Sequence, residues 1–225
     1  PIHARDVTVV EDHYLYLSAP NPTPFQVNVT YGNGIIVPGS PFTISQGNPQ
    51  TIDVGFGQPS PMFLDIQDIN IVTNTGGLIL TGTEDFYATF KIRAQNHAEI
   101  LVSKGIPGIG TNFRLGSLPQ VSAGGARNFV SSFMATQDNT TVTVSDYDTG
   151  VVFASGSGDV TLDSQTFNLN KGQSVVLSGY SDNGPNLAGF VGALLTSDKP
   201  IAVNTGNALA GMTNPSPGGQ DYNLR

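Results

Sequence analysis

Paired carboxylates are the side chains of this sequence best suited to chemistry. They occur in four short segments: Asp65 and Asp68, Glu84 and Asp85, Asp146 and Asp148, and Asp159 and Asp163. Carboxylate and carbonyl oxygens in loops between strands are good ligands for Ca²⁺, so Asp146 and Asp148 in "SDYD" are candidate calcium ligands. None of the four segments has the spacing of an EF-hand loop. The competing interpretation is that all of them are solvated turn residues.

The same carboxylates are the basis of an enzymatic hypothesis, a polysaccharide hydrolase. Its two carboxyl groups would have to lie about 5–9 Å apart, and the sequence has no Trp to line a sugar cleft. His3, His13 and His97 have no metal-ligand or triad spacing. The glycines of "GIPGIG" (105–110) do not fit a dinucleotide motif, and we interpret this segment as a flexible connection. The sequence therefore predicts no catalytic and no cofactor-binding residues.

Charge and composition narrow the range of partners. The 225-residue chain has 9 Lys and Arg against 17 Asp and Glu, a formal net charge of -8. The basic residues are scattered singly, which argues against nucleic acid as a partner. No apolar run approaches the ~20 residues of a membrane span, so we expect no direct membrane insertion. The chain has no Cys, which excludes disulfides and thiolate metal sites. A cysteine-free acidic chain rich in Thr, Asn and Gly resembles many bacterial surface proteins.

Alternation of apolar and polar residues with a period of two predicts an all-β fold. Gly, Asn, Asp and Pro separate the alternating runs, as expected of turns between short strands. The predicted strands span residues 13–18, 25–31, 42–45, 51–55, 69–72, 86–92, 99–103, 129–133, 141–145, 166–170, 174–178, 192–196 and 201–204. We find no amphipathic helix and expect only one or two short helical turns, near 59–66 or 183–190.

The order of these segments repeats along the chain. Residues 13–19 match 128–134 and residues 27–29 match 142–144 at an offset of 115 (142 − 27), 42–47 match 167–172 at 125 (167 − 42), and 71–80 match 194–203 at 123 (194 − 71). Four matches in one order indicate an internal duplication.

The duplication predicts two β units and a connection. We expect a first unit over residues 1–84, an intermediate β-hairpin module over 85–127, a second unit over 128–210 and the start of a further segment over 211–225. Units of this length favour tandem antiparallel, Ig-like β-sandwiches. Blades of a β-propeller are the alternative, because the intermediate module is only about half as long as a unit. The abrupt ends of the chain suggest a segment of a longer protein.

Two local patterns have structural interpretations. "GALLTSDKPIAVNTGN" (192–207) is interpreted as a hairpin whose turn, "TSDKP", carries Asp198 and Lys199 as surface decoration. Tyr14 and Tyr16 share one face of their strand, as do Phe129 and Phe133 of theirs. We expect all four aromatic side chains to fill the core of a sandwich.

The ordered motifs resemble the N-terminal domain family of the IgGFc-binding protein. "YLYLSAPNPTPFQVNVTY", "PFTIS", "QTIDVG" and "INIVTNTGGLILTG" are similar to the opening of that domain. "GTNFRLGSLPQ", "FMATQDNTTVTVSD", "FNLNKGQSVVLSG" and "LLTSDKPIAVNTGN" follow in the same order, and "GGQDYN" is similar to the start of its next segment. The resemblance covers about residues 13 to 223.

This resemblance implies a non-enzymatic extracellular module. Such modules occur in mucus-associated animal proteins and in large Bacteroidota surface proteins, including gliding-motility adhesins exported by the type 9 secretion system. The chain lacks the Cys and the Cys-rich repeats of the animal examples. For that reason the resemblance is not extended to immunoglobulin binding, and no binding residue is transferred.

Three hypotheses of function follow. The first is an extracellular module of a large bacterial cell-surface adhesin, whose partner is a glycan, another extracellular polymer or a surface protein. The second is a structural spacer, or a domain that secretion or motility machinery recognises through exposed strand edges. The third and least favoured is the polysaccharide hydrolase. Apart from the Ca²⁺ candidate, none of them calls for a cofactor.

Overall fold

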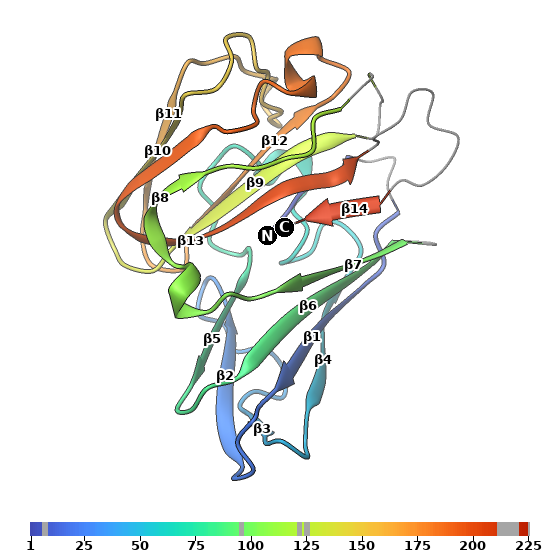
Figure 1. The fold of residues 1–225 in the computed structure, drawn as a ribbon, viewed down its shortest axis with the longest axis vertical. Coiled ribbons are helices and arrows are strands. Elements are labelled where there is room, and N and C mark those ends of the chain that lie inside the picture. The colour runs from blue at the N-terminus through green and yellow to red at the C-terminus, as the bar shows by residue number, and fades with distance from the viewer. Residues whose placement is uncertain (6–8, 95–96, 121–122, 124–126, 211–220, 225) are drawn as a thin grey trace.

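Antiparallel β-strands make up the computed structural model of the chain, which describes residues 1–5, 9–94, 97–120, 123, 127–210 and 221–224 (Figure 1). The strands are β1 (Asp12–Ser18), β2 (Phe25–Tyr31), β3 (Phe42–Ile44), β4 (Gln50–Phe56), β5 (Leu78–Gly82), β6 (Tyr87–Ala94), β7 (His97–Val102), β8 (Gly110–Arg114), β9 (Asn128–Ala135), β10 (Thr140–Ser145), β11 (Gln165–Leu169), β12 (Ser174–Tyr180), β13 (Leu194–Ala210) and β14 (Asp221–Leu224). Three short 3₁₀ turns are η1 (Ile66–Asp68), η2 (Ile106–Gly108) and η3 (Gly184–Leu187). The all-β prediction is confirmed, and the described residues contain no α-helix.

β1 to β7 form two sheets that enclose a common core. The first sheet has the order β4-β1-β6-β7 and the second the order β3-β2-β5. Leu15 and Leu17 of β1 and Val27 and Val29 of β2 belong to one buried cluster, because alternate residues of each strand point inward. The two sheets therefore pack face to face as a sandwich, and each keeps one side turned outward.

β8 to β14 form a single sheet that bends around a second core. Its order is β11-β10-β13-β9-β12, and β8 and β14 also pair with β13. The 17 residues of β13 pair with β10 near their beginning and with β9 further along. Figure 1 shows β10 and β13 curving across this half of the molecule. Phe133, Val144 and Phe153 lie in the core that the bent sheet encloses.

The same strand pairing occurs in both halves of the chain. β1 lies between β4 and β6 as β9 lies between β12 and β13, and β2 lies between β3 and β5 as β10 lies between β11 and β13. The registers place Val27 opposite Phe42 and Val142 opposite Phe167. Equivalent residues are thus 115 positions apart in β2 (142 − 27) and 125 in β3 (167 − 42). Both offsets equal those found in the sequence.

The predicted hairpin over residues 192–207 is wrong. β13 runs through "TSDKP" as one strand, with an irregularity in register between Thr196 and Ile201. Its counterpart in the first half is the pair β5 and β6, since Leu80 and Leu195 are 115 positions apart (195 − 80) and occupy equivalent pairs with β2 and β10. Residues 83–86 separate β5 from β6, whereas β13 continues without a break.

The charged pair that was assigned to this turn holds β13 in place. The carboxylate of Asp198 accepts a hydrogen bond from the backbone N–H of Thr141 (2.8 Å). The ammonium of Lys199 donates to the carbonyl oxygens of Asp138 (2.5 Å) and Asn139 (2.9 Å). Lys199 binds the tight turn between β9 and β10, and Asp198 binds the second residue of β10, so both are structural contacts of a continuous strand and not surface decoration.

The predicted strand over residues 69–72 is also wrong, and with it the match of residues 71–80 to 194–203. Asn70 has a left-handed φ of 59°, which ends the extended run. The loop that follows lies along the edge of β12. The N–H of Asn70 donates to the carbonyl oxygen of Val176 (2.8 Å), and the backbone groups of Thr73 and Ser174 form two hydrogen bonds with each other (2.8 and 3.0 Å). The loop covers a strand edge that would otherwise present unpaired backbone groups.

The aromatic residues of β1 and β9 point to different sides. Phe129 and Phe133 are buried in the second core, as predicted. Tyr14 and Tyr16 alternate with the buried residues of β1 and point outward, so the prediction that they fill the core is wrong. The predicted match of residues 13–19 to 128–134 at an offset of 115 is therefore wrong by one residue: Leu17 and Phe133 occupy equivalent inward positions and are 116 positions apart (133 − 17). A shift of one residue moves every side chain of a strand to the other face.

The two halves share buried surface. Val130, Val176 and Ala208 of the second sheet belong to the core cluster of the first half. As a result β9 is buried on both of its faces. The layered packing agrees with sandwiches and not with propeller blades.

The predicted domain boundaries stay a prediction. Because β6 follows residue 84 and pairs with β1, we propose that the first unit extends beyond residue 84. The predicted segment 211–225 lies mostly outside the described residues.

Candidate functional site

The outward side of the sheet β4-β1-β6-β7 gathers aromatic, charged and hydroxyl side chains on one surface. Residues that are cross-strand partners on this side point the same way. We call the following set the open face: Thr51, Asp53 and Phe56 of β4, Asp12, Tyr14, Tyr16 and Ser18 of β1, Tyr87, Thr89, Lys91 and Arg93 of β6, and Ala98, Ile100 and Val102 of β7. All of these side chains are exposed or half-buried.

Tyr14 and Tyr16 lie at the centre of the open face. Their ring centroids are 6.4 Å apart, and the ring planes are inclined by 53°. Tyr14 lies between Asp53 on β4 and Lys91 on β6, and Tyr16 lies between a threonine of each of the same strands. The arrangement offers aromatic surface for stacking with hydrogen-bonding groups on both sides.

The open face carries equal numbers of acidic and basic side chains. Asp12 and Asp53 carry negative charge, and Lys91 and Arg93 carry positive charge. Arg93 contacts the carboxylates of Asp12 and of Glu11, each at 3.3 Å. Exposed ion pairs of this kind contribute little to stability, so the main effect of these pairs is to orient the side chains.

The hydroxyl of Tyr14 stays protonated over the physiological range. The nearby carboxylate of Asp12, together with partial desolvation and the charge of Asp53, raises the pKa of Tyr14 above its ordinary value of 10.0. A neutral phenol both donates and accepts a hydrogen bond. Tyr14 can therefore bind a ligand hydroxyl in either role.

Three large apolar side chains belong to the open face at the ends of its strands. Phe56 is 68% exposed, Tyr87 63% and Val102 57%. Phe56 lies beside Asp12 at one end of the face, whereas Tyr87 lies beside Ser18 and Val102 beside Thr89 toward the other end. They add exposed apolar area at both ends of the face.

His13 belongs to the core behind the open face. Its ring is fully buried, is stacked on Phe63 at 4.9 Å and lies with Nε2 3.0 Å from the carbonyl oxygen of Gly57. Burial lowers the pKa of His13 below its ordinary value of 6.5, because the charged form loses its hydration. His13 is therefore a neutral core residue at neutral pH.

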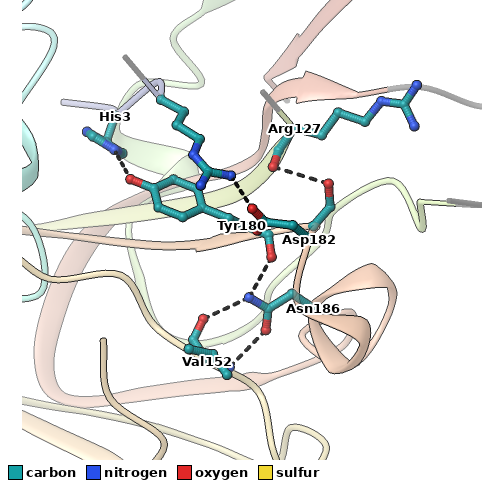
Figure 2. Close-up of polar contacts among 8 residues, drawn as sticks. His3, Arg127, Val152, Tyr180, Asp182 and Asn186 are labelled. Atoms are coloured by element: carbon teal, nitrogen blue, oxygen red, sulfur yellow. Dashed lines mark hydrogen bonds and ion pairs between the residues drawn. The ribbon is translucent and has the colours of Figure 1, made fainter. Parts of the chain in front are cut away.

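His3 joins the N-terminal segment to the second half of the chain. Its Nδ1 lies 2.8 Å from the carbonyl oxygen of Leu64, and its Nε2 lies 3.0 Å from the hydroxyl of Tyr180 (Figure 2). Arg5 lies over the ring of Tyr180 at 4.2 Å and contacts Asp182 at 2.6 Å. This polar network links the two halves. His97 lies in β7, and its side chain is outside the described residues.

The neighbouring Asn186 has its amide fully bonded. Its nitrogen donates to the carbonyl oxygens of Val152 (2.8 Å) and Tyr180 (2.9 Å), and its oxygen accepts from the N–H of Val152 (2.8 Å), as Figure 2 shows. The hydroxyl of Ser181 donates to the carbonyl oxygen of Arg127 (3.2 Å). The amide of Asn186 and the hydroxyl of Ser181 bind backbone groups of neighbouring loops, which indicates a structural role.

The calcium candidates lie apart from the open face. Asp146 has a left-handed φ of 58°, and its carboxylate forms an ion pair with Arg114. The N–H of Asp148 donates to the carbonyl oxygen of Gly189 (2.9 Å), and both Asp side chains are exposed. No group of three or more His, Cys, Asp or Glu in the described part of the chain could hold a metal ion. Ca²⁺ at Asp146 and Asp148 stays a prediction.

The other carboxylate pairs lie in loops. Asp65 caps the turn η1 by accepting from the N–H of Ile66 (2.7 Å). Asp68, Glu84, Asp85, Asp159 and Asp163 are exposed. The segment 105–110, interpreted as a flexible connection, contains the turn η2 and the first residue of β8.

Sequence reasoning missed the polar partners of the tyrosines. Asp53 and Lys91 lie in segments that were predicted as strands, at positions that alternate with the buried residues Ile52 and Ile92. Period-two alternation could have placed both on an outward face. The pattern could not show that β4 and β6 flank β1, because strand order is set by the tertiary fold.

Comparisons with known proteins give one match. A family model described as "IgGFc binding protein" matches residues 101–223, more than half of the chain. The matched range contains β8 to β13, whereas nearly all of the open face precedes it. No curated protein and no solved structure matches the chain. Separately, none of the described residues forms a helix that is long and apolar enough to cross a membrane.

Proposed function

Because this chain belongs to the IgGFc-binding protein family, we propose that it is a non-enzymatic binding module of a bacterial cell-surface adhesin. The partner is an extracellular polymer or a surface protein, and the module acts outside the cell, in the service of attachment or gliding. The cysteine-free, acidic composition supports a bacterial surface protein over an animal mucus protein.

The paired tyrosines on an outward sheet face are the observation that carries this proposal. In the second half, the equivalent strands β9 and β12 have their outer side buried against the first half. In the first half, the outer side of β1 and β4 carries half-buried and exposed side chains, among them the half-buried Tyr14 and Tyr16. Exposed aromatic side chains next to charged groups are typical of binding surfaces.

A binding assay with two matched variants tests the proposal. The recombinant chain is applied to supports of chitin, cellulose, xylan, gastric mucin and fibronectin, and the retained fraction is measured. We expect retention on at least one support and its loss in the double variant Tyr14→Ala/Tyr16→Ala. The control is Thr143→Ala/Thr166→Ala, which removes an outward cross-strand pair of β10 and β11 whose hydroxyl oxygens are 3.0 Å apart.

Two results would contradict the proposal. Equal retention of the tyrosine variant and the wild type would show that binding lies elsewhere. No retention of the folded wild-type chain on any support would favour the spacer hypothesis, or a domain recognised by secretion or motility machinery. Circular dichroism and thermal unfolding of each variant separate lost binding from lost folding.

A further inference from the structure

We propose that the ligand of the open face is a neutral polysaccharide chain, an inference that rests on the proposed binding function. Aromatic rings on the outward side of a sheet can stack on the apolar faces of sugar rings, and the rings of Tyr14 and Tyr16 offer two such surfaces inclined by 53° to each other. Flanking carboxylate, ammonium and hydroxyl groups can then bind the sugar hydroxyls. Tyr14 with Asp53 and Lys91, and Tyr16 with Thr51 and Thr89, form two such rows side by side.

The size of the face favours a polymer chain over a folded protein. Four strands at about 4.8 Å and four rows of outward residues at about 7 Å cover roughly 540 Å². A stable protein–protein interface usually buries about 800 Å² on each partner. An extended chain needs less width, because it can follow the line from Tyr14 to Tyr16 along β1 and leave the rest of the sheet uncovered.

The charges favour a neutral chain over an acidic one. The open face has two carboxylates, Asp12 and Asp53, against the two cations Lys91 and Arg93, so it offers no net positive charge. Arg93 is already engaged by Asp12 and Glu11. The whole chain carries a formal net charge of -8, which repels polyanions at long range. Charged groups that are paired on the surface remain able to bind uncharged hydroxyls.

The two tyrosine rows give the ligand a direction. Tyr14 and Tyr16 are two residues apart on β1, so the line that joins them runs along the strand. Their partners on β4 and β6 lie across it. A polysaccharide that contacts both rings, which are inclined by 53° to each other, therefore runs parallel to β1, and its hydroxyls point toward the neighbouring strands.

Native affinity electrophoresis tests this inference. The chain is run in gels that contain xyloglucan, galactomannan or mixed-linkage β-glucan, and in gels that contain polygalacturonate as an acidic control. We expect slower migration with at least one neutral polysaccharide and unchanged migration with polygalacturonate. Because Tyr16→Ala removes one of the two aromatic rings, it should weaken binding roughly tenfold, whereas Tyr16→Phe keeps the ring and should bind more nearly as the wild type does.

The choice of variants separates stacking from general loss of apolar surface. Leu162→Ala, at a side chain that is 47% exposed in a loop of the second half, serves as the control and should bind as the wild type does. Asp53→Asn should weaken binding without affecting folding, since Asp53 is exposed beside Tyr14.

Three outcomes would overturn the inference. One is normal migration of the wild type in every neutral polysaccharide, and another is retardation by polygalacturonate alone. The third is retardation that Tyr14→Ala/Tyr16→Ala leaves unchanged. If the tyrosine variant loses retention on fibronectin while no polysaccharide binds, the open face is a binding surface and only the ligand class is wrong. The inference and the proposed function therefore fail in distinguishable ways.

Discussion

Neighbouring residues of β1 have opposite environments. His13 is fully buried and stacked on Phe63, whereas the next residue, Tyr14, lies on the open face. The side chains differ because successive residues of a strand point to opposite sides of the sheet. A titratable group on the buried side influences stability, while a phenol on the outer side is available to a ligand.

We predict that His13 makes the protein less stable in mild acid. Its pKa is lowered in the folded state, so between that pKa and the ordinary 6.5 the unfolded chain binds a proton that the folded chain does not. The stability is therefore complete above about pH 6.5 and falls as the pH drops below it. His13→Gln keeps a polar side chain without titration in this range. Urea unfolding at pH 7.5 and 5.5 should show a smaller loss in the variant than in the wild type.

An equal loss of stability in both proteins would refute this assignment. The other histidines are present in both, so their contribution cancels in the comparison. The predicted quantity is the loss of unfolding free energy between pH 7.5 and 5.5 in the wild type minus the same loss in the variant. It does not depend on the absolute stability of either protein.

Alternation in the sequence predicted which residues share a face, but not which face is buried. Tyr14 with Tyr16, and Phe129 with Phe133, were correctly grouped as pairs. The tyrosine pair points outward and the phenylalanine pair inward, because equivalent positions of β1 and β9 are 116 residues apart and not 115. That register depends on which strands lie on either side, and those contacts are not visible in a local pattern.

β13 shows how tertiary contacts override turn chemistry at the scale of an element. "TSDKP" has the composition of a turn, yet it continues a strand of 17 residues. Asp198 binds the start of β10 and Lys199 binds the turn before it, and these contacts hold the chain in an extended course. Nothing local in the sequence indicates that these two charges have a partner about sixty residues earlier.

We predict that Asp198→Ala lowers the free energy of unfolding by about 1 kcal/mol. The substitution removes the hydrogen bond to the N–H of Thr141 at 2.8 Å, and a single hydrogen bond typically contributes about that amount. Asp159→Ala removes an exposed carboxylate for which the structure gives no hydrogen bond, and it should be nearly neutral. Chemical denaturation of the two variants provides the measurement. An Asp198 variant as stable as the Asp159 variant would show that the contact contributes nothing.

The fold class and most strands could be predicted from the sequence. Which strands pair with one another could not. The offsets of 115 and 125 for β2 and β3 are the same in sequence and structure. The matching of residues 71–80 failed because Asn70 bends the chain and the following loop pairs with β12. Strand β8 was missed, and it exists because β13 offers it an edge.

The two halves of the molecule meet at closely packed backbone. Gly32 follows β2 and Gly172 precedes β12, and a Cβ placed on Gly172 would lie 2.1 Å from the carbonyl oxygen of Gly32. Gly172 also has a φ of 83°, which favours glycine. The close approach supports the same inter-half packing that buries Val130 and Val176. This packing leaves the open face of the first half as the outward surface.

We predict that Gly172→Ala destabilises the whole molecule by about 3 kcal/mol. About 1 kcal/mol comes from backbone strain at positive φ, and the rest comes from the steric overlap with the backbone of Gly32. Gly34→Ala is the matched control, because Gly34 has a similar φ of 80° but nothing within 4 Å of its added Cβ. Thermal unfolding should show a clearly larger fall in Tm for Gly172→Ala. Similar falls for both variants would mean that the halves separate at little cost.

Hydroxyl-radical footprinting of the bound chain tests most directly the claim that the open face binds the partner. The chain is oxidised free in solution and while bound to the support that retains it most, and the modification of each aromatic residue is compared. If the open face binds the partner, binding should protect Tyr14, Tyr16 and Tyr87 from oxidation. Phe167 on the second half should react to the same extent in both states. Protection confined to the second half, with unchanged oxidation of Tyr14 and Tyr16, would contradict it.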